Sequence, residues 1–335
     1  LGNLGQPEEL LPLMCSYFVI QLVSLPFVCW FNTFRQFTDG ITDTRVAMWI
    51  LIGGNIMNVF GNWVLIYGHL GMEEMGLVGA GLSTMISRIV MAIVMVSIFF
   101  FSKRYKEYRK GWRQGSINRT DFKQVTVLGL PLALQMGMET AAFSLSSLMV
   151  GWFGTTALAA HQVMLTISQL GYMIYYGLAA AVAVRISNFM GQRDYTAVKR
   201  TATAGIHLVF FLAMLTSIPV FIFRHSIGGL FTDSSEVVSM VSMTIIPFMI
   251  YQFGDGMQCN YANAMRGIAV VKPLIWIAFV AFFIVSLPLG YLFGVVMNYQ
   301  LIGIWYAFPF GLTTAGLLYY IYYQKGLKRI EESAK

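Results

Sequence analysis

Residues 76–101 read GLVGAGLSTMISRIVMAIVMVSIFFF, and these 26 residues contain a single charged side chain, Arg88. A helix of about 20 apolar residues is long enough to cross the hydrocarbon core of a bilayer, which is roughly 30 Å thick. A soluble domain would have to bury such a segment completely within its core. We therefore predict that residues 76–101 form a helix that crosses a membrane.

The rest of the chain has the same character. Its 335 residues are 57% hydrophobic and 11% charged, whereas a soluble domain carries about 25% charged residues. The apolar runs are continuous and do not alternate as the strands of a membrane barrel do. Because a backbone in lipid must satisfy its own hydrogen bonds, these runs are predicted to be helices. The nine predicted spans are 9–33, 45–68, 76–101, 124–149, 156–182, 200–223, 237–262, 273–296 and 300–323. The expected fold class is all-α, a polytopic membrane protein.

Basic residues are distributed unevenly among the connections between the spans. Of the 22 lysines and arginines, 20 lie in alternate connections, among them Arg266 and Lys272. The opposite connections contain only Arg224, and Arg88 lies inside a span. Lysine and arginine accumulate on the cytoplasmic side, so we predict a cytoplasmic C-terminus. The net charge of +7 then reports topology, and we expect no nucleic-acid partner.

The chain also matches itself without a gap at an offset of 227 residues. Residues 40–41 match 267–268, and residues 76–80 match 303–307. The first three spans therefore repeat the last three, and the middle three have no counterpart upstream. We expect their partners to precede Leu1, which would give two six-helix lobes of the same orientation and twelve helices in all. Parallel repeats of this kind are a transporter architecture; the alternative is chance similarity between glycine-rich helices.

This repeat predicts how the chain is organised. The expected parts are a partial N-terminal lobe over 1–101, a basic cytoplasmic connector over 102–122, a C-terminal six-helix lobe over 123–323 and a cytoplasmic tail over 324–335.

Two acidic residues, Glu139 and Asp255, lie well inside predicted spans. A charge at the middle of a bilayer costs about 2.5–3.5 kcal/mol on insertion scales, so such residues face protein or a water-filled cavity and are functional candidates. Gln135 lies one helical turn before Glu139, and Tyr251 and Gln258 lie one turn on either side of Asp255. A close pair of carboxylates can exchange a proton for Na⁺ or for a cationic substrate. The alternative is that each acid only forms a hydrogen bond to a neighbouring helix.

A proline and two glycines near Asp255 suggest a break in its helix. Gly254 and Gly256 flank the acid, and Pro247 lies two turns before it. A kink at this point would expose backbone carbonyls to an ion.

Further polar residues mark a possible substrate pathway. Asn58 and Asn62 lie one turn apart in the second span, where hydrogen bonding between helices is the favoured interpretation and a polar pathway the alternative. Arg88 could pair with an acid of an upstream helix, line a central cavity or bind backbone carbonyls. Tyr172 and Tyr176 belong to a polar-aromatic patch with Gln169 and Tyr175. Ring faces bind amphipathic cations, although core packing explains the patch equally well. His161 is interpreted as a hydrogen-bonded core residue more readily than as a proton relay.

The order of several motifs resembles the multidrug and toxic compound extrusion (MATE) transporters. The residues that carry the resemblance are Leu128-Gly129-Leu130-Pro131, Glu139, Leu158-Ala159-Ala160-His161-Gln162, Phe253-Gly254-Asp255, Met265-Arg266-Gly267 and Gly303-Ile304-Trp305. The resemblance covers essentially the whole chain, as helices four to twelve of twelve, with the first three absent. It implies a two-lobe fold and a secondary antiporter that exports organic cations or drugs in exchange for Na⁺ or H⁺ in a bacterial inner membrane.

The resemblance also implies roles for individual residues. In NorM-type members of that family, acids of the seventh and tenth helices bind the coupling cation, with a tyrosine one turn before the second acid; these roles carry over to Glu139, Asp255 and Tyr251. Any Na⁺ would be bound by Glu139 and Asp255, and no other metal or cofactor is expected. The expected partners are the lipid bilayer and small organic cations, with the protein a monomer.

Two other classes of function remain as alternatives. A flippase for lipid-linked sugars would share the fold but usually has a cationic cavity, whereas the membrane region of the second lobe contains two acids and, by this reading, no basic residue. A membrane-embedded enzyme or a receptor is disfavoured, because the chain has no HExxH motif, no cluster of metal ligands and no nucleophile motif. We therefore expect that the protein is not an enzyme.

Overall fold

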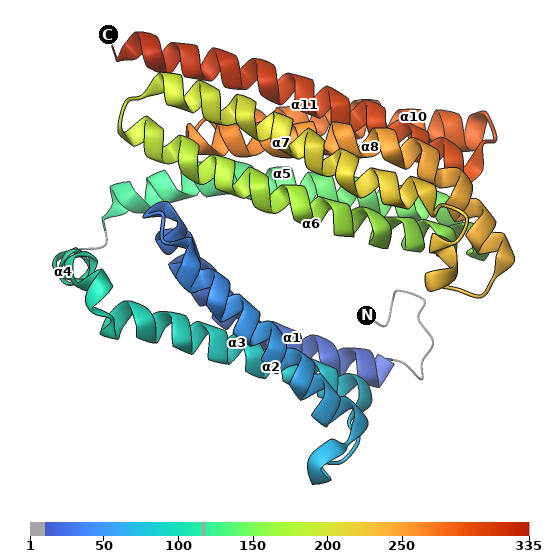
Figure 1. Ribbon diagram of the computed structural model, residues 1–335, viewed down its shortest axis with the longest axis horizontal. Coiled ribbons are helices and arrows are strands. Elements are labelled where there is room, and N and C mark those ends of the chain that lie inside the picture. The colour runs from blue at the N-terminus through green and yellow to red at the C-terminus, as the bar shows by residue number, and fades with distance from the viewer. Residues whose placement is uncertain (1–10, 116–117, 335) are drawn as a thin grey trace. The chain divides into compact units, whose positions relative to one another are not determined.

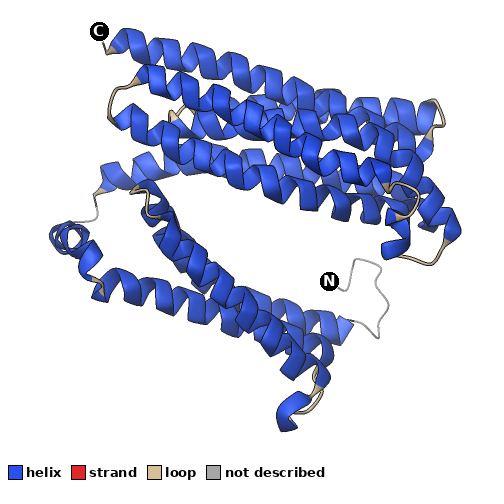
Figure 2. Ribbon diagram, viewed as in Figure 1, coloured by secondary structure: helices blue, strands red, loops and turns tan. Residues whose placement is uncertain are grey.

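The computed structural model describes residues 11–115 and 118–334, and every regular element within these ranges is a helix (Figure 2). Nine of these helical segments are long and apolar enough to cross a bilayer. The prediction of an all-α, polytopic membrane protein is therefore confirmed. The start of the first predicted span, residues 9 and 10, lies outside the described ranges. The chain divides into two compact units, Leu1–Ile117 and Asn118–Lys335.

The first unit contains three long helices that pack against one another. They are α1 (Leu11–Gly40), α2 (Thr44–Tyr67) and α3 (Gly76–Phe101). Their shared core contains Phe31, Ala47, Ile50, Ala92 and Met95. The shorter elements of this unit are η2 (His69–Gly71), η3 (Lys103–Tyr105) and α4 (Lys106–Gln114).

The second unit is a bundle in which long helices run side by side (Figure 1). Its long helices are α5 (Arg119–Gly151), α6 (Thr155–Gly191), α7 (Tyr195–Ile222), α8 (Ser235–Gly267) and α11 (Gln300–Ser333). Between α8 and α11 one further membrane-spanning segment consists of four successive helical elements: α9 (Lys272–Ala278), the π-helix η5 (Phe279–Ser286), α10 (Leu287–Tyr291) and the π-helix η6 (Leu292–Val296). The short η4 (Ile227–Leu230) precedes α8. Helix α8 packs on α6, α7 and α11 and lies at the centre of the bundle.

Several helices extend beyond the spans predicted from hydropathy. Helix α8 continues to Gly267, so that Arg266 lies in its last turn and not in a loop. Helix α11 continues to Ser333, where Lys328 and Glu332 lie one turn apart with a nitrogen–oxygen distance of 3.8 Å. Polar residues with good helix propensity extend these helices past the apolar core, which hydropathy alone does not register.

Helix α8 runs without interruption from Ser235 to Gly267 and contains Pro247, so the helix is not broken near Asp255. The glycines on either side of Asp255 serve close packing. A Cβ atom on Gly254 would lie 2.9 Å from Thr313 Oγ1 on α11, and one on Gly256 would lie 2.6 Å from Val209 Cγ1 on α7. Small residues of this kind let membrane helices approach closely, and here they hold Asp255 at the centre of the lobe.

The internal repeat is visible in the backbone as well as in the sequence. Helices α1 and α8 end at Gly40 and Gly267, which are 227 residues apart. In each repeat the turn that follows contains a non-glycine residue in the left-handed region, Thr42 at φ 64° and Ala269 at φ 58°. Because this conformation is uncommon for residues with a Cβ atom, its recurrence at the same offset supports a true repeat.

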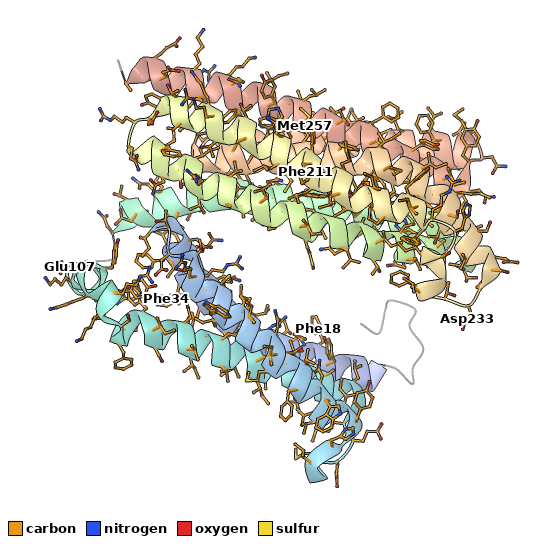
Figure 3. All side chains as sticks on the ribbon, in the orientation of Figure 1. Phe18, Phe34, Glu107, Phe211, Asp233 and Met257 are labelled. Atoms are coloured by element: carbon orange, nitrogen blue, oxygen red, sulfur yellow. The ribbon has the colours of Figure 1, made fainter. Side chains whose placement is uncertain are left out.

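Large apolar side chains cover the outside of both units. Phe18 on α1 is 52% exposed and Phe211 on α7 is 61% exposed (Figure 3). Water would penalise this surface, whereas a bilayer solvates it. The chain is therefore an integral membrane protein.

A buried polar cluster joins the α1–α2 turn to the end of α3. Asp43 is 4% exposed, and its Oδ2 atom accepts a hydrogen bond of 2.6 Å from the Tyr105 hydroxyl. Arg104 Nε lies 2.9 Å from the same oxygen. Burial, and then the hydrogen bond to Asp43, raise the pKa of Tyr105 to about 12 from its ordinary value of 10.0. The cluster is thus stable while Tyr105 is protonated.

Replacing Tyr105 with phenylalanine is expected to make this unit less sensitive to alkali. Because folding raises the pKa of Tyr105, the hydroxyl stabilises the fold fully below pH 10 and loses this effect as the pH rises towards 12. The thermal midpoint of Tyr105→Phe should therefore fall less steeply over this range than that of the wild type. The matched control is Tyr108→Phe, which alters an exposed tyrosine. Equal slopes for Tyr105→Phe and the wild type would contradict the prediction.

Candidate functional site

The two membrane acids face one cavity within the second unit. Glu139 from α5 and Asp255 from α8 both line a space of about 400 Å³. The other lining residues are polar, aromatic or flexible apolar side chains of α5, α6 and α8: Met136, Thr140, Phe143, Ser144, Ser147, Leu165, Ser168, Gln169, Tyr172 and Tyr251. The cavity is large enough for a hydrated ion, and its wall is rich in oxygen atoms.

Asp255 is almost completely buried and accepts a hydrogen bond from a tyrosine of a neighbouring helix. It is 2% exposed, and its Oδ2 atom accepts a short hydrogen bond from the hydroxyl of Tyr175, a residue of α6 with no exposed surface. Tyr251, one turn earlier on α8, lines the same cavity as Asp255 and Ser168. The Tyr175 hydroxyl stabilises a carboxylate that lipid would otherwise destabilise.

Glu139 lies on α5, whereas Asp255 lies on α8. The side chain of Glu139 is only partly buried, because it borders the cavity. Its Oε1 atom accepts a hydrogen bond of 3.1 Å from Gln258 Nε2 on α8. The two carboxylates are close enough to interact electrostatically. Two like charges in a region of low dielectric repel each other, so a bound cation or proton stabilises the pair.

Tyrosine rings of α6 form one side of the site. Tyr172 lines the cavity and stacks on Tyr176, with ring centroids 5.1 Å apart. Tyr172 also meets Tyr175 edge to face, with centroids 5.8 Å apart. Tyr175 thus connects the aromatic patch to the carboxylate of Asp255, and the patch offers a ring face towards the space beside the acids.

Ser147, at another part of the cavity wall, belongs to a rigid hydrogen-bonded group. His161 has no exposed surface; its Nδ1 atom accepts a bond of 3.1 Å from Trp305 Nε1, and its Nε2 atom lies 3.0 Å from Ser147 Oγ. An indole nitrogen can only donate, so Nδ1 is the acceptor and the neutral imidazole carries its proton on Nε2. This geometry favours the interpretation of His161 as a core residue that links α5, α6 and α11.

Gln135, one turn before Glu139, is 2% exposed and does not line the cavity. Its Oε1 atom accepts a hydrogen bond of 3.0 Å from Arg266 Nη2 at the end of α8. The side chain of Arg266 therefore reaches back into the bundle. Arg266, expected in a loop, thus lies in the last turn of α8 and directs a basic side chain into the bundle.

The remaining pathway candidates belong to the first unit. Asn58 Nδ2 on α2 donates to Ser83 Oγ and to Thr84 Oγ1 on α3, each at 3.3 Å, and Asn62 Nδ2 donates to Asn58 Oδ1 at 3.3 Å. These bonds connect α2 to α3, as expected for polar groups that join membrane helices.

Arg88, on α3, makes contacts of a different kind. Its Nη1 atom donates to Gln21 Oε1 at 2.6 Å and to Ser24 Oγ at 2.7 Å, both on α1. Both partners are neutral side chains, and these bonds connect α3 to α1.

The chemistry of the cavity suits a monovalent cation. No group of three or more His, Cys, Asp or Glu residues that could hold a metal ion occurs in the described ranges. Two carboxylates with hydroxyl and amide oxygens around them match the hard oxygen ligands that Na⁺ would require, and the same carboxylates can take up a proton.

Two residues important to this geometry were not selected from the sequence as site residues. Tyr175 was assigned to an aromatic patch, and Arg266 was assigned to a loop. The signal for Tyr175 was its register, because Ser168, Tyr172 and Tyr175 recur at helical spacing on an otherwise apolar segment. The position of Arg266 depends on how far α8 extends, which hydropathy does not indicate.

Comparison with known proteins gives consistent results. The MatE family profile matches residues 131–292 of the chain. A protein described as multidrug resistance protein NorM from Aliivibrio fischeri is 32% identical over 307 residues, which cover 90% of this chain and 67% of that protein. A protein described as a probable multidrug resistance protein NorM from Photorhabdus laumondii is 29% identical over 328 residues, covering 96% of this chain and 71% of that protein.

Solved structures share the fold at lower identity. One, described as the outward-facing conformation of a multidrug resistance MATE family transporter, has a TM-score of 0.88 at 18% identity. The match covers 98% of this chain and 73% of that structure. A second, described as a MATE P26A mutant, also has a TM-score of 0.88 at 18% identity.

Proposed function

The chain belongs to the multidrug and toxic compound extrusion (MATE) family, and from this premise we propose that it is a multidrug transporter that exports organic cations in exchange for Na⁺ or H⁺. The observation that carries the proposal is the cavity of the second unit, which Glu139 and Asp255 line together. The curated relatives are described as multidrug resistance proteins. This relationship favours a transporter over an enzyme.

The buried acid pair supports exchange in the following way. With no cation bound, the two carboxylates repel each other beside a wall of tyrosines, and an organic cation relieves this repulsion. Na⁺ or H⁺ relieves it as well, so that the two kinds of cation oppose each other's binding through linkage. Alternating exposure of such a site to the two sides of the membrane exchanges one cation for the other. Tyr251, Tyr175 and Gln258 hold the carboxylates in place during the exchange.

The gradient of the coupling cation drives export. In a one-for-one exchange of monovalent cations no net charge crosses the membrane, so the energy comes from the Na⁺ or H⁺ concentration gradient, at about 1.4 kcal/mol for each tenfold ratio. A second coupling cation per cycle would add about 2.3 kcal/mol at 100 mV, inside negative. The strongly basic connections would lie in the cytoplasm together with the C-terminus, in the inner membrane of a bacterium.

A lipid-linked sugar flippase is the second candidate function, and one observation favours it. Arg266 and Arg88 place positive charge inside the helical units, as a site for a pyrophosphate group would require. Neither arginine lines the cavity, whose charged residues are Glu139 and Asp255. An anionic substrate would be repelled there, so the cation antiporter is the better explanation.

Transport by the purified protein, as its gene encodes it, tests the proposal. In liposomes with an imposed Na⁺ gradient, or with an imposed pH gradient in Na⁺-free buffer, one of the two gradients should drive tetraphenylphosphonium against its own gradient. Collapse of that gradient by an ionophore should abolish the accumulation. Failure of both gradients to move tetraphenylphosphonium, with concurrent translocation of a lipid-linked sugar, would establish the flippase instead.

A further inference from the structure

The exchange reaction does not account for the guanidinium of Arg266, in the last turn of α8. Arg266 lies on the same face of α8 as Asp255 and Gln258, about two turns beyond Gln258. Its side chain is only partly exposed and is directed into the bundle, as the bond to Gln135 shows. A charge held inside a membrane protein is costly and usually has a functional partner.

The direct contacts of Arg266 do not neutralise it. Nη2 donates to Gln135 Oε1 at 3.0 Å, and Nη1 lies 3.5 Å from Asn263 Oδ1, so both contacts are to neutral amides. The Nε atom is buried and has no hydrogen-bond partner among the described residues. The positive charge therefore remains available to a more distant group.

That group is Glu139, which lies one helical turn beyond Gln135 on the same face of α5, so the guanidinium bonded to Gln135 is near the carboxylate. The titratable groups around Glu139 are Asp255, Tyr251 and Cys259 on α8, Tyr172 on α6 and Tyr319 on α11. All of these groups are neutral or negative. Arg266 adds a positive charge to these surroundings of Glu139, the acid that borders the cavity.

Among the described residues, buried polar atoms without partners occur on Arg266 itself and on two residues of α8 and α11. Gln258 Oε1 and the Tyr319 hydroxyl are buried without a hydrogen-bond partner in the described part of the chain, as is Arg266 Nε. Buried polar atoms of this kind are satisfied by ordered water. Gln258 is bonded to Glu139 and lies about two turns before Arg266 on α8, so polar side chains lie on this helix between the cavity and the end that carries Arg266.

We propose that Arg266 is a positioning residue that competes with the coupling cation: its fixed charge weakens the binding of Na⁺ or H⁺ at Glu139 and speeds the release of that cation towards the end of α8. The inference rests on the proposed antiport function, which it deepens. Without Arg266, the acid pair would bind the coupling cation more tightly and would release it more slowly.

The test is a displacement experiment on full-length protein in detergent. Bound radioactive tetraphenylphosphonium is displaced by Na⁺ at fixed alkaline pH and, separately, by acidification in Na⁺-free buffer. For Arg266→Gln the inhibition constant of the effective cation, calculated with that variant's own affinity for the probe, should fall roughly tenfold, as for the loss of one nearby charge. The rate of exchange in liposomes should fall as well. Arg266→Lys keeps the charge and should resemble the wild type in this displacement.

Two further variants separate charge from fold. Gln135→Glu keeps the guanidinium but gives it an anion of its own, and should shift displacement in the same direction as Arg266→Gln even if the latter folds poorly. Lys325→Gln removes an exposed charge near the C-terminal end of α11 and should change nothing. Wild-type displacement values in both Arg266→Gln and Gln135→Glu would overturn this inference alone, as would an equal shift in Arg266→Lys. Failure of both cations to displace the probe from the wild type would overturn the antiport proposal itself.

Discussion

Glu139→Gln and Asp255→Asn are each expected to abolish ethidium export from cells, by at least a factor of about one hundred, while the protein remains in the membrane. Each substitution preserves the shape of the side chain and its hydrogen-bonding capacity but removes a charge from the cavity. A neutral amide can neither take up a proton nor attract Na⁺, so the exchange has no coupling cation. The measurement is the rate of ethidium efflux, normalised to the amount of protein in the membrane.

Matched substitutions of exposed acids serve as controls for this experiment. Asp233 lies in the loop before α8 (Figure 3), and Glu236 lies in the first turn of that helix. Both are exposed, so Asp233→Asn and Glu236→Gln should export ethidium as the wild type does. The double variant of Glu139 and Asp255 should be no worse than either single variant, because the two acids act as one unit. Wild-type efflux from both single variants would disprove the coupling role.

Gly303→Ala is expected to destabilise the second unit strongly, although it adds one methyl group. A Cβ atom at Gly303 would lie 2.6 Å from the backbone carbonyl carbon and oxygen of Phe293, and backbone atoms cannot rotate away. The start of α11 must then separate from η6. Overpacking of this kind typically costs about 1–3 kcal/mol. The displacement would also reach Trp305 and its bond to His161. Thermal unfolding of the purified protein measures the effect.

Gly177→Ala is the matched control for this variant. Gly177 lies in α6, where an added Cβ atom meets nothing within 4 Å. Because alanine favours a helix by up to about 1 kcal/mol over glycine, the thermal midpoint should stay the same or rise. If Gly303→Ala and Gly177→Ala shift the midpoint in the same direction and by similar amounts, the backbone contact at Gly303 does not control the stability of α11.

The fold was predictable from sequence because two strong signals act on the same segments. Continuous apolar runs such as residues 76–101 can only be helices in lipid. The distribution of lysine and arginine assigns each connection to one side of the membrane. The repeat at an offset of 227 residues showed which helices of the two units correspond. Thr42 and Ala269, both in the left-handed region, match at that offset.

The candidate site was predictable in part. Glu139 and Asp255 could be selected because a charge in lipid is costly, and the structure places them on one cavity. Their donors could not be selected by this criterion, since tyrosine is common in membrane helices and Tyr175 becomes informative only when α6 packs against α8. Arg266 was assigned to a loop because hydropathy reports where lipid ends and says nothing about how far a helix continues into water.

The repeated turns after Gly40 and Gly267 also have an evolutionary consequence. Their shared backbone indicates that one ancestral gene segment was duplicated and that the copies kept their framework. At the same offset Asp255 corresponds to Val28, and Arg266 corresponds to Asp39. The two copies therefore share the turns but differ in these charges. A duplicated lobe can specialise in this way, because one copy can lose or reverse a costly membrane charge as long as its sister retains the ion chemistry on which the cell depends.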